Sequence, residues 1–332
     1  MAASKIRAAE SGGLTCWVLS EGMAGTENQC LALAAGLGLT PEIKRAAAKP
    51  LWRWLGAAMA VLPPQNLAQG RDSLAPPWPD LLIASGRKCA GLALAIRRAS
   101  GGRTFTVFVQ NPRLGLSAFD LIVVPRHDGL AGANVFATRG ALSRVDGATL
   151  ESAAAEFAPT FADLPRPLVA CLIGGASRRH RLTPDDGQAL GAALAKLSAT
   201  SGCGLLVTAS RRTPAASFRA LEVALDGTPA YIWRGEGANP YLGFLALAEA
   251  ILVTADSVSM VSDACASGKP VHILGLAGRR SARFQRFFDA LEAEGAVRPF
   301  TGSLESWSYQ PLSDCALAAG EIRRRLEQRN KV

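Results

Sequence analysis

The stretch that decides the fold is AILVTADSVSMVSDACASGKPVHIL, residues 250–274. A short apolar run over 250–255 stops at a Thr-Ala-Asp-Ser turn, and a serine-rich segment of helical period follows over 258–267. A second apolar run, 270–274, begins at the proline of Ser-Gly-Lys-Pro. Two uniformly apolar strands joined by a helix are typical of a parallel sheet with both faces covered. The stretch therefore predicts an α/β fold.

The same alternation of apolar runs and helical segments recurs along the chain. The other predicted strands are 14–20, 79–85, 105–110, 119–125, 167–175, 204–210 and 229–233. The other predicted helices are 27–37, 51–61, 88–99, 183–198, 214–224, 241–248, 281–293 and 313–329. Residues 81–109 also repeat the strand, turn, helix, glycine, strand order of 250–274, which supports two similar sheets.

The chain is long enough for two domains, with 332 residues. The segment 150–167 is rich in alanine and proline and has no strand character, so we place the boundary there. We predict two Rossmann-like domains, residues 1–157 and 158–332, with parallel sheets that face a cleft, and a final helix in the second domain.

Composition limits the partners. A net charge of +9 suits nucleic acid, an anionic membrane surface or a phosphorylated ligand. Only 6% of the residues are aromatic, and no interleaved aromatic and basic signature is present, so we expect no nucleic-acid partner. The seven cysteines are scattered without a CxxC pair, which predicts neither a metal site nor a disulfide framework.

The expected location is the cytoplasm. No apolar run reaches the roughly 18 to 20 residues that cross a bilayer, and the first residues lack the apolar core of a secretory signal. Segment 51–61 carries Trp52 and Trp54 near basic residues, which is typical of a helix lying on an anionic membrane surface. Peripheral attachment to the inner membrane is therefore one interpretation, and a core-facing helix is the other.

Ligands of open α/β sheets bind beyond the carboxyl ends of the strands. LIGGASRRHR (172–181) and SRRTP (210–214) each follow a predicted strand and combine small residues with arginines. Backbone N–H groups beside guanidinium groups suit a diphosphate, and a solvated basic loop is the alternative. The candidate phosphate ligands are Gly174, Gly175, Ser177, Arg178, Ser210, Arg211, Arg212 and Thr213.

The start of the helix in the opening stretch offers a further anion site. Ser257, Ser259 and Met260 would present backbone N–H groups there. Capping alone explains Asp256 or Ser257. It does not explain Asp263, one turn inside the helix, whose carboxylate suits the two hydroxyls of a ribose.

Residues 255–270 resemble the nucleotide-sugar signature of GT-B glycosyltransferases such as the MurG-like enzymes. In that signature an acidic residue seven positions before the proline of Gly-x-Pro binds the ribose of the nucleotide. Gly268-Lys269-Pro270 puts Asp263 at that position. Asp256 stands where those enzymes have a neutral or basic residue.

Most of the chain, about 14 to 310, is similar to the elongated-mitochondria fission-factor family. The shared segments are GMAGTENQ (22–29), QNPR (110–113), PRHDG (125–129), GGASRRH (174–180), SRRTP (210–214) and ADSVSMVSDA (255–264). The family comprises plant proteins of the mitochondrial outer surface and bacterial relatives without an assigned reaction. The resemblance implies a GT-B-like fold and, in plants, recruitment of a dynamin-type division protein.

The sequence leaves catalysis open. GT-B transfer uses a nucleotide-sugar donor and needs no metal in the usual case, so we expect no separate cofactor. An inverting reaction needs a base near the acceptor hydroxyl, and the candidates are His127, Asp128 and Glu21 at strand ends of the first half. Residues that would face the acceptor, or simply form turns, are Gly22, Gly25, Asn28, Gln29, Asn111 and Arg113.

Two functions follow from these patterns. The first is metal-independent glycosyl transfer from a nucleotide-sugar to an envelope or lipid-linked acceptor. The second is a catalytically inactive adaptor of the same fold that recruits a division or envelope protein. An NAD-dependent sugar epimerase is excluded, because no GxGxxG follows the first strand and no Tyr-x-x-x-Lys occurs.

Overall fold

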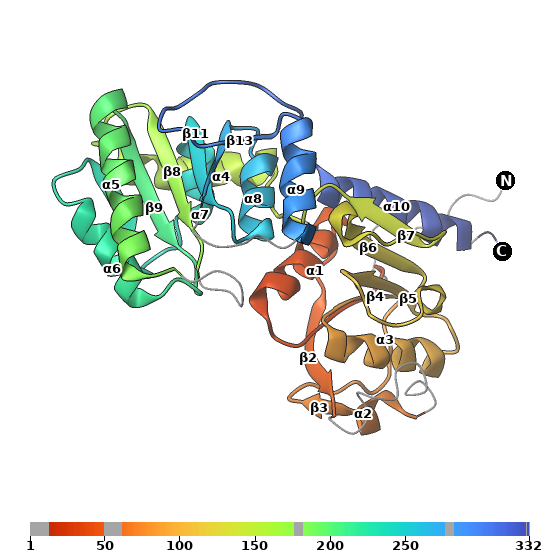
Figure 1. Ribbon diagram of the computed structural model, residues 1–332. Helices are drawn as coiled ribbons and strands as arrows, with labels where there is room; N and C mark the ends of the chain where they lie inside the picture. Colours follow the sequence, from red (N-terminus) through yellow and green to blue (C-terminus); the bar gives the residue numbers. More distant parts are fainter. Residues whose placement is uncertain (1–12, 50–61, 176–181, 276–281, 330, 332) are drawn as a thin grey trace. The chain divides into compact units, whose positions relative to one another are not determined.

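The computed structural model describes residues 13–49, 62–175, 182–275, 282–329 and 331 (Figure 1). The chain divides into two compact units. The first unit comprises Met1–Arg144 and Asp314–Val332, and the second comprises Val145–Ser313. Each unit has its own sheet and its own core.

The sheet of the first unit has the order β3-β2-β1-β4-β5-β6-β7. Only β2 and β3 pair antiparallel in this sheet, as far as the described residues show. Its strands are β1 (Cys16–Ser20), β2 (Glu42–Ala48), β3 (Ala68–Gly70), β4 (Leu81–Ser85), β5 (Phe105–Val109), β6 (Leu121–Pro125) and β7 (Val135–Thr138).

Helices cover both faces of this sheet. Successive side chains of a strand point to opposite faces, so Val18 and Leu19 of β1 belong to different cores. Val18 packs in the core formed with α1 (Ala24–Gly36) and α10 (Asp314–Arg329). Leu19 packs in the core formed with α2 (Pro64–Leu67) and α3 (Arg87–Ala99). Two short 3-10 helices, η3 (Leu116–Ala118) and η4 (Arg126–Asp128), flank β6.

The sheet of the second unit is parallel, with the order β10-β9-β8-β11-β12-β13. Its strands are β8 (Leu168–Ile173), β9 (Gly204–Ala209), β10 (Ala230–Trp233), β11 (Ala250–Thr254), β12 (Val271–Leu274) and β13 (Val297–Pro299). In each unit the first strand lies between the second and the fourth. The strand order therefore reverses between β1 and β4 and between β8 and β11, which is where ligands of doubly wound sheets bind.

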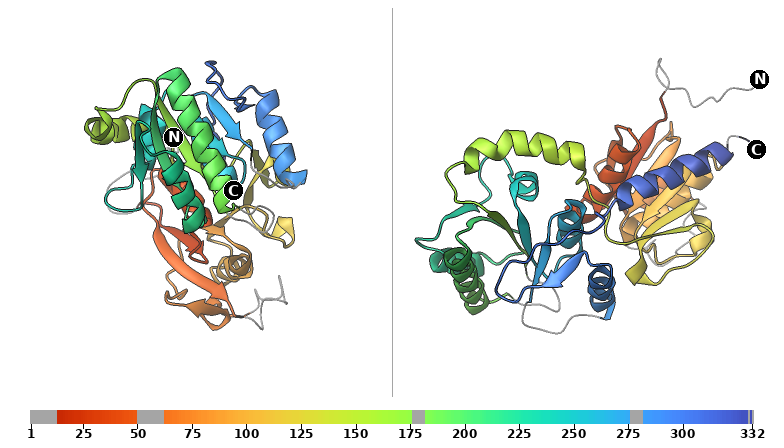
Figure 2. Two further views of the ribbon diagram at one scale, coloured as in Figure 1. Left: turned by 60° about the vertical axis from the view of Figure 1, so that its left-hand side comes forward. Right: turned by 90° about the horizontal axis from the view of Figure 1, so that it is seen from above.

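Helices also cover both faces of the second sheet. One face carries α5 (Pro184–Ser201) and α6 (Ala215–Ala224), which lie side by side. The other face carries α4 (Gly147–Phe157), η5 (Ala158–Phe161), α7 (Tyr241–Leu247), α8 (Val258–Ala266) and α9 (Ala282–Ala293). Figure 2 shows α4 on the opposite side of the second sheet from α5 and α6.

The structure confirms the predicted α/β class, and every predicted strand is present. The two segments that echo one another in sequence occupy equivalent places, as β4-α3-β5 and β11-α8-β12. Strands β2, β3, β7 and β13 were not predicted. The predicted helix 51–61 lies outside the described residues, and Lys44 and Arg45 just before it belong to β2.

The division of the chain differs from the predicted domains 1–157 and 158–332. Helix α4 belongs to the second unit because Phe157, at its end, packs with Phe161 and Phe244 in the core of that unit. Helix α10 belongs to the first unit because Ala318 and Ile322 are fully buried in the core beside α1. The last helix therefore completes the first unit rather than the second.

None of the helices in the described ranges is long and apolar enough to cross a membrane.

Candidate functional site

The loops that follow β8, β9 and β11 meet at the carboxyl edge of the second sheet, around Asp256. The Gly175 N–H donates to Oδ2 of Asp256 at 2.9 Å, and Nη2 of Arg212 donates to the same oxygen at 3.0 Å. The Thr254 hydroxyl donates to Oδ1 at 2.7 Å. The Asp256 side chain is 0% exposed, so the three donors balance a carboxylate that water does not reach.

The two glycines after β8 allow this close approach. A Cβ atom on Gly174 would lie 1.8 Å from Oδ1 of Asp256, and one on Gly175 would lie 2.1 Å from the backbone carbon of Arg212. The Gly174 N–H donates to the Thr254 hydroxyl at 2.7 Å. Both glycine amides are therefore used inside the protein. This corrects the predicted role of Gly174 and Gly175, because their N–H groups do not point to an open diphosphate site.

The loop after β9 is held by its own hydroxyl groups. Oγ of Ser210 lies 3.1 Å from Oγ1 of Thr213 and accepts the N–H of Arg212 at 3.2 Å. The Thr213 hydroxyl donates to the Gly174 carbonyl at 2.7 Å, which ties this loop to the one after β8. Ser210 and Thr213 therefore order the loop, whereas Arg211 is exposed and forms no ion pair with any residue that the structure describes.

The start of α8 is capped as the sequence indicated. Ser257 is the N-cap, and its hydroxyl accepts the Met260 N–H at 3.4 Å. Ser259 and Met260 are half-buried in the first turn. Ser177 and Arg178 lie outside the described residues, so their predicted phosphate contacts stay predictions.

Asp263 lies one turn further along α8 and has a partner that the sequence did not reveal. The Tyr241 phenol, at the start of α7, donates to Oδ2 of Asp263 at 3.0 Å. Burial raises the pKa of Tyr241, and the negative charge of Asp263 raises it further. The phenol is therefore neutral at physiological pH and orients the carboxylate as a hydrogen-bond donor. The only feature of the sequence that could have pointed to Tyr241 is the Asn-Pro turn before it.

In the first unit the candidate base Glu21 is used to cap a helix. Its Oε1 accepts the Lys88 N–H at 2.8 Å, and its Oε2 lies 3.2 Å from the ammonium of Lys88. A Cβ atom on Gly86, the N-cap of α3, would lie 2.6 Å from Oε1. The Glu21 carboxylate thus connects the end of β1 to the start of α3, at the point between β1 and β4 where the strand order of the first sheet reverses.

His127 and Asp128 are close together after β6, with Nε2 and Oδ1 3.8 Å apart. Their side chains are 3% and 7% exposed. The structure brings the predicted pair together, and both side chains are buried. A base for an incoming hydroxyl would need a more open position.

Most of the residues predicted on the acceptor side form local structure. The Gln29 amide donates to the Gly25 carbonyl at 3.1 Å, and the Gly22 N–H donates to the Ser20 hydroxyl at 2.8 Å. The Asn111 side chain accepts the Arg113 N–H at 2.9 Å, in the turn-forming role given as its alternative. The remaining one, Asn28, is exposed on α1.

Glu27 and Arg45 form an ion pair that the sequence did not predict. Arg45 donates from Nε at 3.1 Å and from Nη2 at 2.7 Å to the two oxygens of Glu27, and the Ser20 hydroxyl donates to Glu27 at 2.7 Å. The hydrogen bond from Arg45 lowers the pKa of Glu27, and the one from Ser20 lowers it further, although burial opposes both. Arg45 belongs to β2, a strand that the sequence analysis did not predict.

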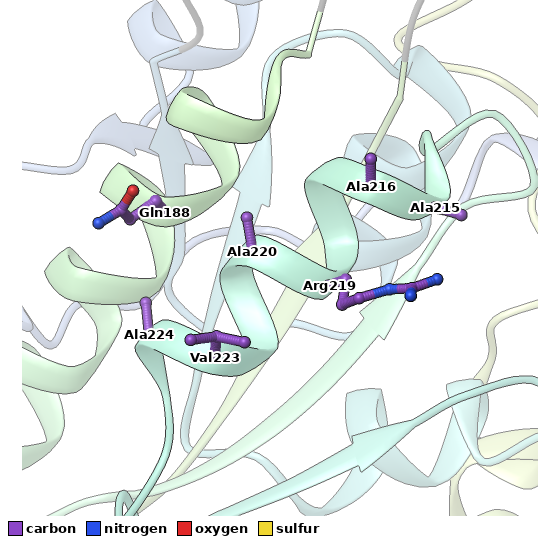
Figure 3. A pocket seen from close by; sticks show the side chains of 7 residues that line it. All are labelled: Gln188, Ala215, Ala216, Arg219, Ala220, Val223 and Ala224. Atoms are coloured by element: carbon purple, nitrogen blue, oxygen red, sulfur yellow. The ribbon is translucent and has the colours of Figure 1, made fainter.

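A separate groove of about 730 Å³ lies between α5 and α6 (Figure 3). It is lined by Gln188 of α5 and by Ala215, Ala216, Arg219, Ala220, Val223 and Ala224 of α6. Its lining is mostly small and apolar, and it includes no residue that the sequence singled out. We therefore do not count it as part of the candidate site.

Solved structures show the class of this fold. A UDP-N-acetylglucosamine 2-epimerase of Methanocaldococcus jannaschii matches over 95% of this chain and 99% of its own, with a TM-score of 0.53 and 12% identity. A candidate UDP-N-acetylglucosamine 2-epimerase of Listeria monocytogenes matches over 96% and 97%, with a TM-score of 0.56 and 13% identity. The protein is therefore a GT-B-like α/β protein with two Rossmann-like sheets.

Within that class, the chain belongs to the mitochondrial fission ELM1 family, whose profile matches residues 24–326. The mitochondrial fission protein ELM1 of Arabidopsis thaliana is 38% identical over 291 residues, which cover 80% of this chain and 67% of the plant protein. The uncharacterized protein RP120 of Rickettsia prowazekii is 26% identical and covers 93% of this chain and 98% of its own. The predicted family resemblance is confirmed.

Proposed function

We propose that the second unit binds the nucleotide part of a nucleotide-sugar at the carboxyl edge of its sheet. The observation that carries this proposal is the position of Asp263, on the helix that directly follows β11 beside the reversal of strand order. Tyr241 orients its carboxylate from the neighbouring helix α7. A fixed carboxylate suits the two hydroxyls of a ribose, because both hydroxyls are donors.

In this proposal, arginine side chains balance the negative charge of the phosphates. Arg211 is exposed in the loop after β9. The neighbouring Arg212 side chain is 44% exposed, although one of its nitrogens is bound to Asp256. Guanidinium groups bind phosphate oxygens through several N–H donors. The site as proposed therefore needs no metal ion and no separate cofactor.

Two activities remain for a protein that binds in this way. Glycosyl transfer to an envelope or lipid-linked acceptor is the first, and it needs a base. The candidate bases are engaged or covered, since Glu21 caps α3 and His127 is 3% exposed. These observations favour the second activity, an adaptor that binds a nucleotide-sugar without transfer and recruits a division or envelope protein. The name of the Arabidopsis relative, a mitochondrial fission protein, supports the same activity.

Ligand screening tests the proposal. The full chain is heated with a panel of UDP-linked and GDP-linked sugars, and a specific ligand at 100 times its Kd should stabilise the fold by about 2.7 kcal/mol. Hydrolysis and transfer of the bound sugar are then measured with the same ligand. Binding without turnover would support the adaptor, turnover would support the transferase, and a chain that binds no nucleotide at millimolar concentration would refute both.

Attachment to an anionic membrane surface is a further proposal that rests on segment 51–61, which lies outside the described residues. Cosedimentation with anionic and neutral vesicles tests it. Binding to the anionic vesicles should weaken at 1 M salt, where the Debye length falls to about 3 Å. A chain that stays in the supernatant with anionic vesicles at low salt would contradict the proposal.

A further inference from the structure

Each unit places one of its own carboxylates at the point where its strand order reverses. In the second unit, Asp256 follows β11 and accepts the N–H of Gly175, which follows β8, at 2.9 Å. In the first unit, Glu21 follows β1 and accepts the N–H of Lys88, which follows β4, at 2.8 Å. In both units a carboxylate from one strand end binds a backbone N–H group beyond the neighbouring strand.

A glycine makes room for the carboxylate in both places. The Cβ of any other residue at position 174 would lie 1.8 Å from Asp256, and the Cβ of one at position 86 would lie 2.6 Å from Glu21. Backbone N–H groups at this edge of a doubly wound sheet are the donors that bind phosphate in many proteins. Here the protein supplies the anion from its own chain.

The carboxylate has more hydrogen-bond partners in the second unit. Asp256 is 0% exposed and holds the Gly175 amide, the Thr254 hydroxyl and one nitrogen of Arg212 at the same time. The Gly174 amide is bound to Thr254 as well. A phosphate that approached this point would find the amides occupied and would meet a buried negative charge, which repels it more strongly than a solvated one.

We infer that Asp256 is a specificity-determining residue that excludes phosphate from the β8–β11 reversal point. The identity of the physiological ligand rests on the proposed function, but the exclusion of phosphate does not. Any phosphate bound by this unit is then held by exposed side chains such as Arg211. The site accordingly favours the nucleoside and sugar parts of a ligand over its diphosphate.

The test uses inorganic pyrophosphate, which needs no ribose site. Asp256→Asn keeps the shape of the side chain, removes its charge and releases Arg212. We expect pyrophosphate to bind at least about tenfold more tightly than to the wild type, because one unit charge about 4 Å away changes an affinity by about fivefold in water and by more at the lower dielectric near a protein surface. Asp226→Asn is the matched control, because it makes the same charge change at an exposed position between α6 and β10, at the opposite edge of the sheet.

A second measurement includes the wild-type chain, and its wild-type result does not depend on the folding of a variant. Pyrophosphate should leave the NMR signal of the Gly175 amide unchanged in the wild type, and in Asp256→Asn it should shift that signal. An Asp256→Asn affinity equal to or weaker than the wild type, or a shift of Gly175 in the wild type, would overturn the inference. Failure of the proposed function would appear differently, as a chain that binds no nucleotide whatever residue stands at position 256.

Discussion

The Tyr241 phenol and the Asp263 carboxylate form a hydrogen bond of 3.0 Å between α7 and α8. The two helices lie on the same face of the second sheet, so this bond fixes the carboxylate relative to the carboxyl edge of β11. A hydrogen bond from the partly buried Tyr241 ring restricts the motion of the carboxylate and leaves its charge in place. The contact with Tyr241 is therefore the feature of the candidate site that the structure shows and the sequence analysis did not predict.

Asp263→Ala should weaken nucleotide binding by about 1.5–3 kcal/mol, because it removes a charged acceptor for the ribose hydroxyls. Tyr241→Phe should weaken it less, since the carboxylate remains and loses only its orientation. Calorimetry with the best ligand of the screen measures both. Asp226→Ala, far from the site at an exposed turn, serves as the control. Unchanged affinity in an Asp263→Ala chain that melts like the wild type would contradict the ribose assignment.

Arg211→Ala should reduce affinity for a nucleoside diphosphate and leave affinity for the nucleoside unchanged. Arg211 is exposed in the loop after β9 and forms no ion pair within the described residues. Its loss should therefore not disturb the fold. Arg219→Ala is the matched control, an exposed arginine on α6 that follows the same loop. The double variant with Arg178→Ala extends the test to the loop after β8. Equal losses for both ligands would mean that the arginine acts through the fold.

Periodicity and apolar runs were sufficient to predict the architecture. Buried strands such as β8 and β11 read as uniform apolar runs because helices cover both of their faces. The missed strands are at or near sheet edges, where the pattern is diluted. Strand β2 contains Glu42, Lys44 and Arg45, and β13 is only 3 residues long. The predicted domain boundary failed for another reason, since Ala- and Pro-rich sequence marks a connection but does not tell which core a helix will join.

The site was predicted in part, because strand ends can be located from sequence but hydrogen-bond partners cannot. The loops 174–175 and 210–213 follow β8 and β9 at the carboxyl edge of the second sheet, and Asp263 lies on α8, the helix that follows β11. The sequence could not show that Asp256 occupies the Gly175 amide, since the two residues are 81 positions apart. It also could not show that Glu21 belongs to the start of α3. Both contacts depend on which strands become neighbours.

Acidification should destabilise the second unit through His272. This side chain is 0% exposed in β12, its Nε2 accepts the Glu305 N–H at 3.4 Å, and Trp307 and Phe300 flank the ring at 5.0 and 6.0 Å. Burial lowers the pKa of His272, and the nearby Glu305 and Arg298 have opposing effects on it. A lowered folded pKa means that stability is complete above the unfolded value near 6.5 and is lost as the pH falls below it.

Urea unfolding followed by tryptophan fluorescence at pH 7.5 and pH 5.5 measures this effect. The midpoint should be lower at pH 5.5, and His272→Leu should show a smaller difference between the two pH values, whatever its own stability. His127→Leu is the control for the other buried histidine of the described chain. A pH difference that is the same in His272→Leu and in the wild type would contradict the assignment.

Close backbone contact between α5 and α6 gives the last prediction. Gly187 in the first turn of α5 leaves no space for a side chain, because a Cβ atom there would lie 2.0 Å from the Ser217 carbonyl oxygen of α6. Gly187→Ala should therefore cost about 1–3 kcal/mol in unfolding free energy, since the two helices must separate to admit the methyl group. Gly320→Ala in α10 makes the same change at an exposed helical position with nothing within 4 Å of the new Cβ, and it should stabilise the fold by about 0.5–1 kcal/mol. Both replacements remove a helical glycine, so the difference between them isolates the contact with Ser217. Thermal and chemical unfolding of the two variants measures that difference, and a Gly187→Ala chain as stable as Gly320→Ala would show that α5 and α6 are not packed at this distance.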